Sequence, residues 1–259
     1  MLRVFHHVLL QYRSMEEHEQ HINGQNDQGH DKVQIAVFDF DDTCIEGSSP
    51  SWLVNRLIFE RMISPATIAK IGLWGVAYKW HLPQSESWVR GQVFRAFAGK
   101  PKESVDEYLV RLYDNYIEKR FRPQADETMR RLAEEGCSVI VVSASFEPIV
   151  LRAMEKHPFH HQISTRMKTA PDGTYTRQVE GLPIEGDAKL MAIKHWCDGH
   201  FGEGNWEIAY AYADHHSDAP LLSAAKHPFA VTPNSAMAKR AAREGWPVLD
   251  WEIDVPRGK

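Results

Sequence analysis

The sequence lacks long hydrophobic runs, an excess of basic residues and paired cysteines. No apolar stretch in its 259 residues approaches the roughly 20 residues of a membrane-spanning helix, so no membrane contact is expected. A formal net charge of −5 leaves no basic footprint for a nucleic-acid partner. The three cysteines Cys44, Cys137 and Cys197 form no CxxC pair, which favours reduced thiols and a cytoplasmic protein.

The first 31 residues differ in composition from the rest of the chain. Residues 1–13 are mildly apolar but have no small-residue cleavage site, so a signal peptide is not expected. Residues 14–32 are polar and contain histidines at irregular spacing, which is a poor pattern for a metal-binding tract. Residues 1–31 are therefore predicted to be a flexible tail.

The most informative segment is Val33–Thr43, in which an apolar run leads into a group of carboxylates. The β-branched and aromatic residues of this run predict a buried parallel strand. The strand is followed by Asp39, Asp41 and Asp42, and unpaired charge beyond a core strand is costly unless a cation or a reaction requires it. Because ligands bind at the carboxyl ends of strands in open α/β sheets, the run predicts an active-site edge. The adjacent Cys44 is expected to be a small packing residue.

Beyond this segment, short apolar strands alternate with amphipathic helices. This alternation predicts a parallel sheet with helices on both faces. The predicted strands are 138–142, 207–212, 229–231 and 248–249, and the helices are 125–134, one from Pro148, 187–197 and 235–244. Pro171-Asp172-Gly173 predicts a turn joining a hairpin of Ser164–Lys168 and Thr174–Gln178.

Residues 48–120 show helical spacing throughout and are predicted to be an all-helical insertion. The expected helices are 52–59, 65–80, 84–98 and 102–119. The expected α/β core consists of residues 32–47 and 121–252.

Further polar residues follow the other predicted core strands. Ser143 follows the second strand, Asp214 and Asp218 follow the third, and Lys189 lies in the helix before the third. In a parallel sheet these residues and Asp39 share one edge, so they are expected to converge on one pocket.

These motifs resemble those of the haloacid dehalogenase superfamily of phosphohydrolases, subfamily IB, which includes phosphoserine phosphatase-like enzymes. The resemblance covers residues 33–252 and rests on the DxDxT run, the strand-end serine, the lysine and the DxxxD pair. It implies a Rossmann-like three-layer parallel sheet with an inserted helical cap. It also implies hydrolysis of a small phosphate monoester through an aspartyl-phosphate, with Mg²⁺ as cofactor.

The resemblance assigns roles to the acidic run. Asp39 would attack phosphorus, and Asp41 would protonate the leaving alkoxide and later activate water. Crowding by other carboxylates is expected to raise the pKa of Asp41. Thr43 would close the turn by hydrogen bonding to backbone. An acid at position 41 points to a phosphate ester, because dehalogenases in the superfamily lack one there.

The resemblance also implies a metal site and a phosphate site. Asp39, Asp214 and the backbone carbonyl of Asp41 would bind Mg²⁺, and Asp218 would hold a water of the metal and orient Lys189. The residues expected to bind the substrate phosphate are Thr43, Ser143, Ala144 and Lys189. Four carboxylates and a phosphate dianion far exceed one lysine in charge, which favours a divalent cation.

The sequence departs from the family pattern at two places. Ala213 stands where a glycine is usual, and His215 and His216 replace small residues, with their role left open. The acidic residue that binds the substrate amine in phosphoserine phosphatases lies nine positions after the nucleophile, and that position is Ser48 here. Phosphoserine is therefore not assigned as the substrate.

Several functional alternatives remain open at this stage. A phosphotransferase or mutase would use the same aspartyl-phosphate, and a non-catalytic protein that binds a phosphate ligand would keep only the fold. Arg90 and Arg95 in the insertion would either contact a substrate or lie in solvent. The expected partner is a small-molecule phosphate ester, and the oligomeric state is left open.

Overall fold

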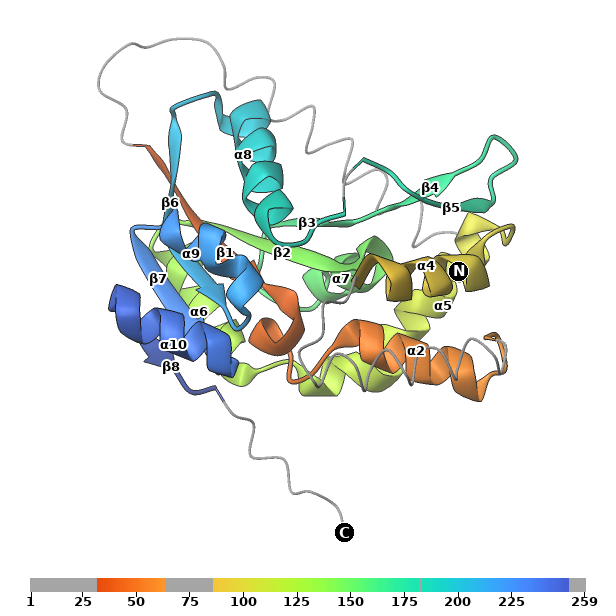
Figure 1. The fold of residues 1–259 in the computed structure, drawn as a ribbon. Coiled ribbons are helices and arrows are strands. Elements are labelled where there is room, and N and C mark those ends of the chain that lie inside the picture. Colours follow the sequence, from red (N-terminus) through yellow and green to blue (C-terminus); the bar gives the residue numbers. More distant parts are fainter. Residues whose placement is uncertain (1–31, 64–85, 182, 252–259) are drawn as a thin grey trace. The chain divides into compact units, whose positions relative to one another are not determined.

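A computed structural model describes residues 32–63, 86–181 and 183–251, and these form a six-stranded parallel sheet with helices around it (Figure 1). The strand order is β3-β2-β1-β6-β7-β8. The strands are β1 (Val33–Asp39), β2 (Ser138–Phe146), β3 (His161–Thr165), β6 (Trp206–Ala213), β7 (His227–Val231) and β8 (Val248–Leu249). The predicted parallel α/β class is confirmed.

The direction of the strand order reverses at β1. From β1 the chain adds β2 and then β3 on one side, whereas β6, β7 and β8 lie on the other side. Val37 of β1 pairs with Ile140 of β2 and with Ala211 of β6, both in parallel. Such a reversal opens a crevice at the carboxyl ends of the central strands, which is where ligands bind in sheets of this kind.

Successive residues of β1 face opposite sides of the sheet, because side chains alternate along a strand. Ile35 and Val37 belong to one apolar cluster, and Ala36 and Phe38 belong to the other. Helices α8 (Asp187–Phe201), α9 (Ala219–Ser223) and α10 (Ser235–Glu244) contribute to the first cluster. Helices α6 (Pro123–Glu134) and α7 (Glu147–Met154) contribute to the second. The sheet is thus the middle of three layers, as predicted.

The segment between β1 and α6 contains helices α2 (Ser49–Phe59), α4 (Glu86–Phe97) and α5 (Lys102–Leu112). A wider turn (Tyr113–Ile117) and a short 3-10 turn (Glu118–Arg120) follow α5 directly, where one helix over 102–119 was predicted. The predicted helix over 65–80 lies outside the described residues. None of the described helices is both long and apolar enough to cross a membrane.

The two ends of this segment lie side by side. Ile45 and Phe121 form an antiparallel bridge, the amide of Glu46 donates to the carbonyl of Arg120, and the amide of Arg122 donates to that of Cys44. The two connections between this segment and the sheet are therefore hydrogen-bonded to each other.

The predicted hairpin is wrong in its first strand. Ser164 and Thr165 belong to β3, which joins the main sheet beside β2 and which the sequence pattern missed. The hairpin proper is β4 (Met167–Thr169) with β5 (Tyr175–Val179). Its turn pairs with the α4–α5 connection, where the amide of Gly99 donates to the carbonyl of Tyr175 and that of Lys102 to the carbonyl of Gly173. The helices of the insertion therefore pack with a β-hairpin from outside it.

Candidate active site

The last residue of β1 and the turn after it supply the first group of site residues. Asp39 ends the strand and is only 4% exposed. A wide turn, η1 (Phe40–Cys44), follows, but its backbone is extended at Asp41 and left-handed at Asp42, with φ of 56°. Aspartate tolerates this left-handed conformation better than most residues. The buried thiol of Cys44 donates to the carbonyl of Asp39 at 2.9 Å, so this cysteine serves packing and the turn.

Gly47 closes the loop after the turn. Its amide donates to Oδ1 of Asp42 at 2.9 Å, and its carbonyl accepts from the amide of Asp42 at 3.0 Å. Gly47 has φ of +92°, and a Cβ at this position would lie 2.9 Å from the ring of Trp52. Only glycine meets both conditions. The loop that carries the acidic run is therefore fixed by local geometry.

Lys189 is the cation at the centre of the site. It lies in the first turn of α8, 5% exposed, and its Nζ contacts Oδ1 of Asp39 at 2.5 Å and Oδ2 of Asp218 at 2.9 Å. Burial alone would lower the pKa of Lys189, but these two carboxylates outweigh burial and raise it. Lys189 is therefore charged at any physiological pH.

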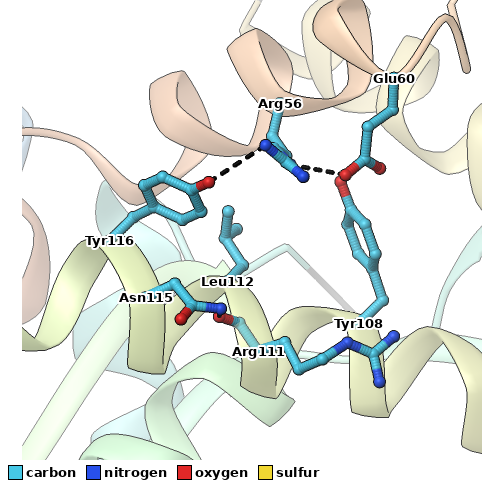
Figure 2. A pocket seen from close by; sticks show the side chains of 7 residues that line it. All are labelled: Arg56, Glu60, Tyr108, Arg111, Leu112, Asn115 and Tyr116. Carbon is cyan, nitrogen blue, oxygen red and sulfur yellow. Dashed lines mark hydrogen bonds and ion pairs between the residues drawn. The ribbon is translucent and has the colours of Figure 1, made fainter.

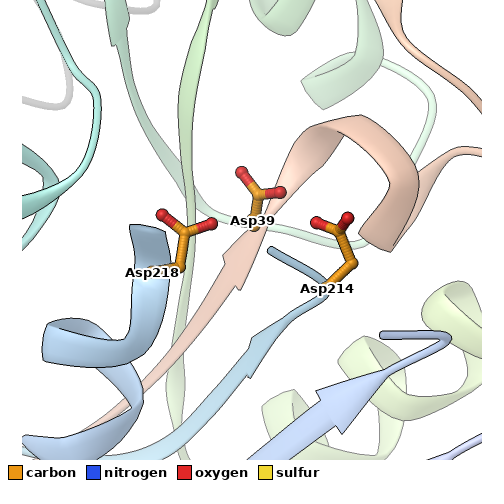
Figure 3. Close-up of side chains that lie close together, drawn as sticks. All are labelled: Asp39, Asp214 and Asp218. Atoms are coloured by element: carbon orange, nitrogen blue, oxygen red, sulfur yellow. The ribbon is translucent and has the colours of Figure 1, made fainter. Parts of the chain in front are cut away.

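Asp39, Asp214 and Asp218 form what we call the strand-end carboxylate cluster (Figure 3). Each is buried, and one carboxylate oxygen from each lies within 4.8 Å of the others. Among the described residues, this is the group of acidic side chains placed to hold a metal ion. Thr43 stands between two of them, since its Oγ1 lies 3.3 Å from Oδ2 of Asp39 and 3.4 Å from Oδ1 of Asp214. Its hydroxyl thus contacts carboxylates, whereas the sequence predicted a backbone contact.

The electrostatics of the cluster favour protonation or a bound cation. Burial raises the pKa of Asp214 to about 9, and the charges of Asp39, Asp42 and Asp218 add to the shift, while Lys189 opposes it. Burial likewise raises the pKa of Asp41 to about 7. The amide of Ser49 opposes that shift, and the charge of Asp39 adds to it. The sequence predicted the direction of the Asp41 shift, but burial comes before carboxylate crowding as its cause.

The carboxyl end of β2 places three small residues, Ser143, Ala144 and Ser145, at the same edge of the sheet. Ser143 is fully buried and pairs with Ser164, and β2 continues to Phe146 across a break in register with β3. The amide of Ser145 donates to Oγ of Ser143 at 2.9 Å, while Ala144 between them is half-buried. The hydroxyl of Ser143 therefore adds a hydrogen bond at this end of β2 to those of the backbone pairing.

The residues that depart from the family pattern take ordinary backbone conformations. Ala213 ends β6 and is not among the described residues with positive φ, so a methyl group is tolerated there. Nδ1 of His215 lies 2.8 Å from the hydroxyl and 3.3 Å from the amide nitrogen of Ser217. Burial lowers the pKa of His215 to about 4, with His216 adding to the shift, so His215 is neutral. His216 is exposed.

Of the two arginines of the insertion that were considered above, Arg95 lies on α4 and is exposed. Glu46, the acidic residue two positions before Ser48, pairs with Arg120 at 3.2 Å. The side chain of Arg90 lies outside the described residues.

Sequence reasoning missed Ser49, the first residue of α2. Its amide donates to Oδ1 of Asp41 at 2.5 Å, and its hydroxyl lies 2.6 Å from that of Ser145. Its position directly before Pro50, at a predicted helix start, was the available signal, but a pattern of this kind does not report tertiary contacts.

Comparison with known proteins agrees with this arrangement. A sequence model of the haloacid dehalogenase-like hydrolases matches residues 36–223. A histidinol-phosphatase of Neisseria meningitidis serogroup C is 25% identical over 221 residues, which cover 84% of this chain and 99% of that protein. A phosphoserine phosphatase of Mycobacterium tuberculosis is 22% identical over 229 residues, covering 86% of this chain and 72% of that protein.

The same fold occurs among solved structures. A Bordetella pertussis protein of unknown function superposes with a TM-score of 0.73 at 22% identity, covering 85% of this chain and 100% of that one. At this level of identity the likeness concerns the fold alone.

Proposed function

This chain belongs to the haloacid dehalogenase-like hydrolase family, and we propose that it is a magnesium-dependent phosphomonoester hydrolase that forms an aspartyl-phosphate on Asp39. The observation that carries the proposal is the strand-end carboxylate cluster, in which Asp39 is buried, paired with Lys189 and two residues before Asp41. A buried cluster with more carboxylates than cations is costly to a fold, so its presence favours a role in chemistry.

In the first step, a carboxylate oxygen of Asp39 attacks the phosphorus of the ester. The new bond joins Asp39 to phosphorus, the bond from phosphorus to the ester oxygen breaks, and its electron pair stays on that oxygen. Asp41 gives its proton to this oxygen, so the product leaves as an alcohol. A pKa of about 7 suits this task, because a large share of Asp41 is then protonated at neutral pH.

In the second step, water replaces the enzyme on phosphorus. Asp41, now a carboxylate, takes a proton from the attacking water, the bond from phosphorus to Asp39 breaks, and inorganic phosphate forms. Both carboxylates return to their starting states. Lys189 and the hydroxyls of Ser143 and Thr43 bind the phosphoryl oxygens, and the half-buried Ala144 lines the same strand end.

The donor set fits Mg²⁺. Oxygen ligands from buried carboxylates are what a small, hard cation prefers. Asp39 and Asp214 would hold it together with the backbone carbonyl of Asp41, while Asp218, bonded to Lys189, would hold a bound water. When bound, the ion would cancel charge on the phosphoryl group and on the carboxylates that surround it. Without such a cation, a phosphate dianion would be repelled by this cluster.

Residues 48–120 act as a cap over the strand ends in this proposal, and residues 32–47 and 121–252 form the catalytic core. Support comes from the paired linkers at 44–46 and 120–122 and from Ser49, which joins the first helix of the segment to Asp41. A cap at this point excludes water during chemistry and favours small phosphorylated metabolites over protein substrates.

The test is phosphate release from a panel of small phosphomonoesters with and without Mg²⁺. Histidinol phosphate and phosphoserine belong in the panel because relatives of this chain are named for them. Mg²⁺-dependent release that disappears in Asp39→Asn is the expected result.

Other outcomes would favour the alternatives. Product that appears only with an added hydroxyl acceptor, with little free phosphate, would indicate a phosphotransferase or mutase. Binding of a phosphate analogue without turnover of any ester would indicate a non-catalytic protein.

A further inference from the structure

The first helix after the acidic turn touches the acid–base carboxylate directly. Ser49 begins α2, and its backbone amide donates to Oδ1 of Asp41 at 2.5 Å. The amides of Ser51 and Trp52, in the same helical turn, instead donate to the carbonyl of Ser48. The first amide of α2 is therefore committed to Asp41, in the way that side chains ordinarily satisfy free amides at helix starts.

The side chain of Ser49 reaches the second strand. Its Oγ lies 2.6 Å from Oγ of Ser145, and Ser49 and Ser145 are 0% and 1% exposed. The amide of Ser145 then donates to Oγ of Ser143 at 2.9 Å. A continuous chain of hydrogen bonds thus joins Asp41 on η1, the start of α2 and the end of β2.

We propose that Ser49 and Ser145 are positioning residues for the proposed hydrolysis, a paired hydroxyl latch that holds the start of α2 against β2 so that the Ser49 amide fixes the carboxyl of Asp41. This inference rests on the proposed function and adds to it that the segment 48–120 contributes its own backbone to the catalytic site. With one oxygen of Asp41 fixed by the amide, the orientation of the other toward a leaving group is set as well.

Because both hydroxyls are buried, the latch requires both of them. A buried hydroxyl without a partner is costly, so each serine here supports the other. If one is replaced by alanine, the other hydroxyl loses the partner at 2.6 Å, and the start of α2 is free to shift away from β2. Such a shift would move the Ser49 amide away from Asp41, although neither serine touches the substrate phosphorus.

The dependence on leaving group separates this role from a general loss of structure. An alkoxide leaving group needs a proton, so hydrolysis of an alkyl phosphate depends on a well-placed acid. The para-nitrophenolate ion leaves readily without one. A misplaced Asp41 should therefore slow the enzyme on glycerol phosphate far more than on para-nitrophenyl phosphate.

Three variants dissect the latch. Ser49→Ala and Ser145→Ala each remove one hydroxyl and keep the backbone. Ser49→Pro also removes the amide hydrogen, and the site tolerates proline because the first position of a helix favours it. The preceding Ser48, with φ of −113° and ψ of 117°, already has the conformation that proline requires of its neighbour. Ser51→Ala, an exposed serine in the same turn of α2, is the matched control.

The measurement is kcat/KM of the full chain with Mg²⁺ on both esters, since this ratio reports the step in which the leaving group departs. We expect Ser49→Pro to lower kcat/KM on glycerol phosphate by about 100-fold and on para-nitrophenyl phosphate by less than about fivefold. Each alanine variant should lose about tenfold on glycerol phosphate only, and Ser51→Ala should match the wild type. If Ser49→Pro does not fold, the two alanine variants carry the test.

Two different failures can be told apart. An active wild type whose variants lose activity equally on both esters, or lose none, overturns the latch and leaves the proposed function standing. If the wild type acts on another alkyl ester of the panel rather than on glycerol phosphate, that ester takes its place in the comparison. A folded wild type that releases phosphate from no ester of the panel, these two included, overturns both.

Discussion

Two polar clusters of this molecule, one buried and one partly buried, are built in opposite ways. The strand-end carboxylate cluster gathers Asp39, Asp214 and Asp218 around the single ammonium group of Lys189. The other cluster, which we call the linker histidine cluster, comprises His157, Asp126 and Tyr113 and lies where the chain returns from α5 to α6. In the first cluster the carboxylates outnumber the cations, whereas in the second the polar groups have hydrogen-bond partners.

In the linker histidine cluster, each polar atom of the ring has its own partner. Nδ1 of His157 lies 2.8 Å from Oδ1 of Asp126, and Nε2 lies 2.9 Å from the hydroxyl of Tyr113. The ring also stacks on Phe121 with centroids 3.4 Å apart. A polar network that is satisfied in this way rigidifies a fold. It joins Tyr113 of the segment 48–120 to α6 and to the turn that follows α7.

In the strand-end cluster, negative charge is left over. Burial raises the pKa of Asp214 to about 9, which means that the folded protein without a cation opposes its ionisation. A polar network with balanced partners thus serves structure, whereas a buried one with surplus charge of a single sign is suited to bind a ligand.

Site-directed variants test the two roles, and the largest effect is expected at Asp39. Asp39→Asn keeps the shape but removes the nucleophile, so phosphate release should fall by at least about 10³-fold while the fold remains. Initial rates on the best ester of the panel measure this. Asp172→Asn, in the exposed hairpin turn, is the control and should be fully active. If Asp39→Asn kept near-normal rates, the strand-end carboxylate cluster would not have the catalytic role proposed for it.

Mg²⁺ should act on the strand-end cluster alone. A cation that binds only the folded protein stabilises it by about 2.7 kcal/mol at a hundred times its dissociation constant. We expect chelation to abolish activity and to lower the melting temperature of the wild type. His157→Ala, which leaves the carboxylates intact, should show the same shift with Mg²⁺, whereas Asp214→Asn should show little or none. Equal Mg²⁺ shifts in Asp214→Asn and the wild type would place the ion elsewhere.

The pH dependence of stability should reflect the titration of Asp214. Because its pKa is raised in the folded state above 3.8, the value of an ordinary aspartate, the metal-free protein loses stability as pH rises toward about 9. The melting temperature without Mg²⁺ should therefore fall between about pH 7.5 and pH 8.5, a window above the pKa of about 6.5 of an ordinary histidine. Asp214→Asn should flatten this slope, and Mg²⁺ should reverse it in the wild type. A wild-type slope that Asp214→Asn leaves unchanged would contradict this electrostatic account.

The smallest effect on activity is expected in the linker histidine cluster. His157→Ala removes the imidazole that contacts both Tyr113 and Asp126, so the free energy of unfolding should fall by about 1–3 kcal/mol. Urea unfolding measures this, with the exposed His195→Ala as control. The value of kcat/KM should stay within about threefold of the wild type. A large loss of activity at unchanged stability would show that the two clusters are not separate in role.

Much of the site could be predicted from the sequence, because most of its residues lie at the ends of strands. Asp39, Ser143 and Asp214 follow apolar runs, and a parallel sheet brings the ends of such runs together whatever the rest of the chain does. Lys189 followed from its helix before the third predicted strand, and the structure places it at 2.5 Å from Asp39.

The remainder depends on contacts that no local pattern encodes. β3 has the sequence His-Gln-Ile-Ser-Thr, with too little apolar character to predict a strand of the main sheet. The latch between Ser49 and Ser145 joins residues 96 positions apart, and small polar residues at helix and strand ends are common without such a bond. The cause of the Asp41 shift was misjudged for a similar reason, since burial is a property of the packed structure.

The most direct test of the central claim is to look for the phosphoryl group on Asp39 itself. The wild type would be mixed with its best ester and Mg²⁺, quenched in acid within the first turnovers, digested and analysed by mass spectrometry. The account predicts a phosphorylated peptide that contains Asp39, that forms only with Mg²⁺ and that is absent from Asp39→Asn. Rapid turnover with the label on another residue, or an Asp39→Asn enzyme that still forms the adduct, would contradict it.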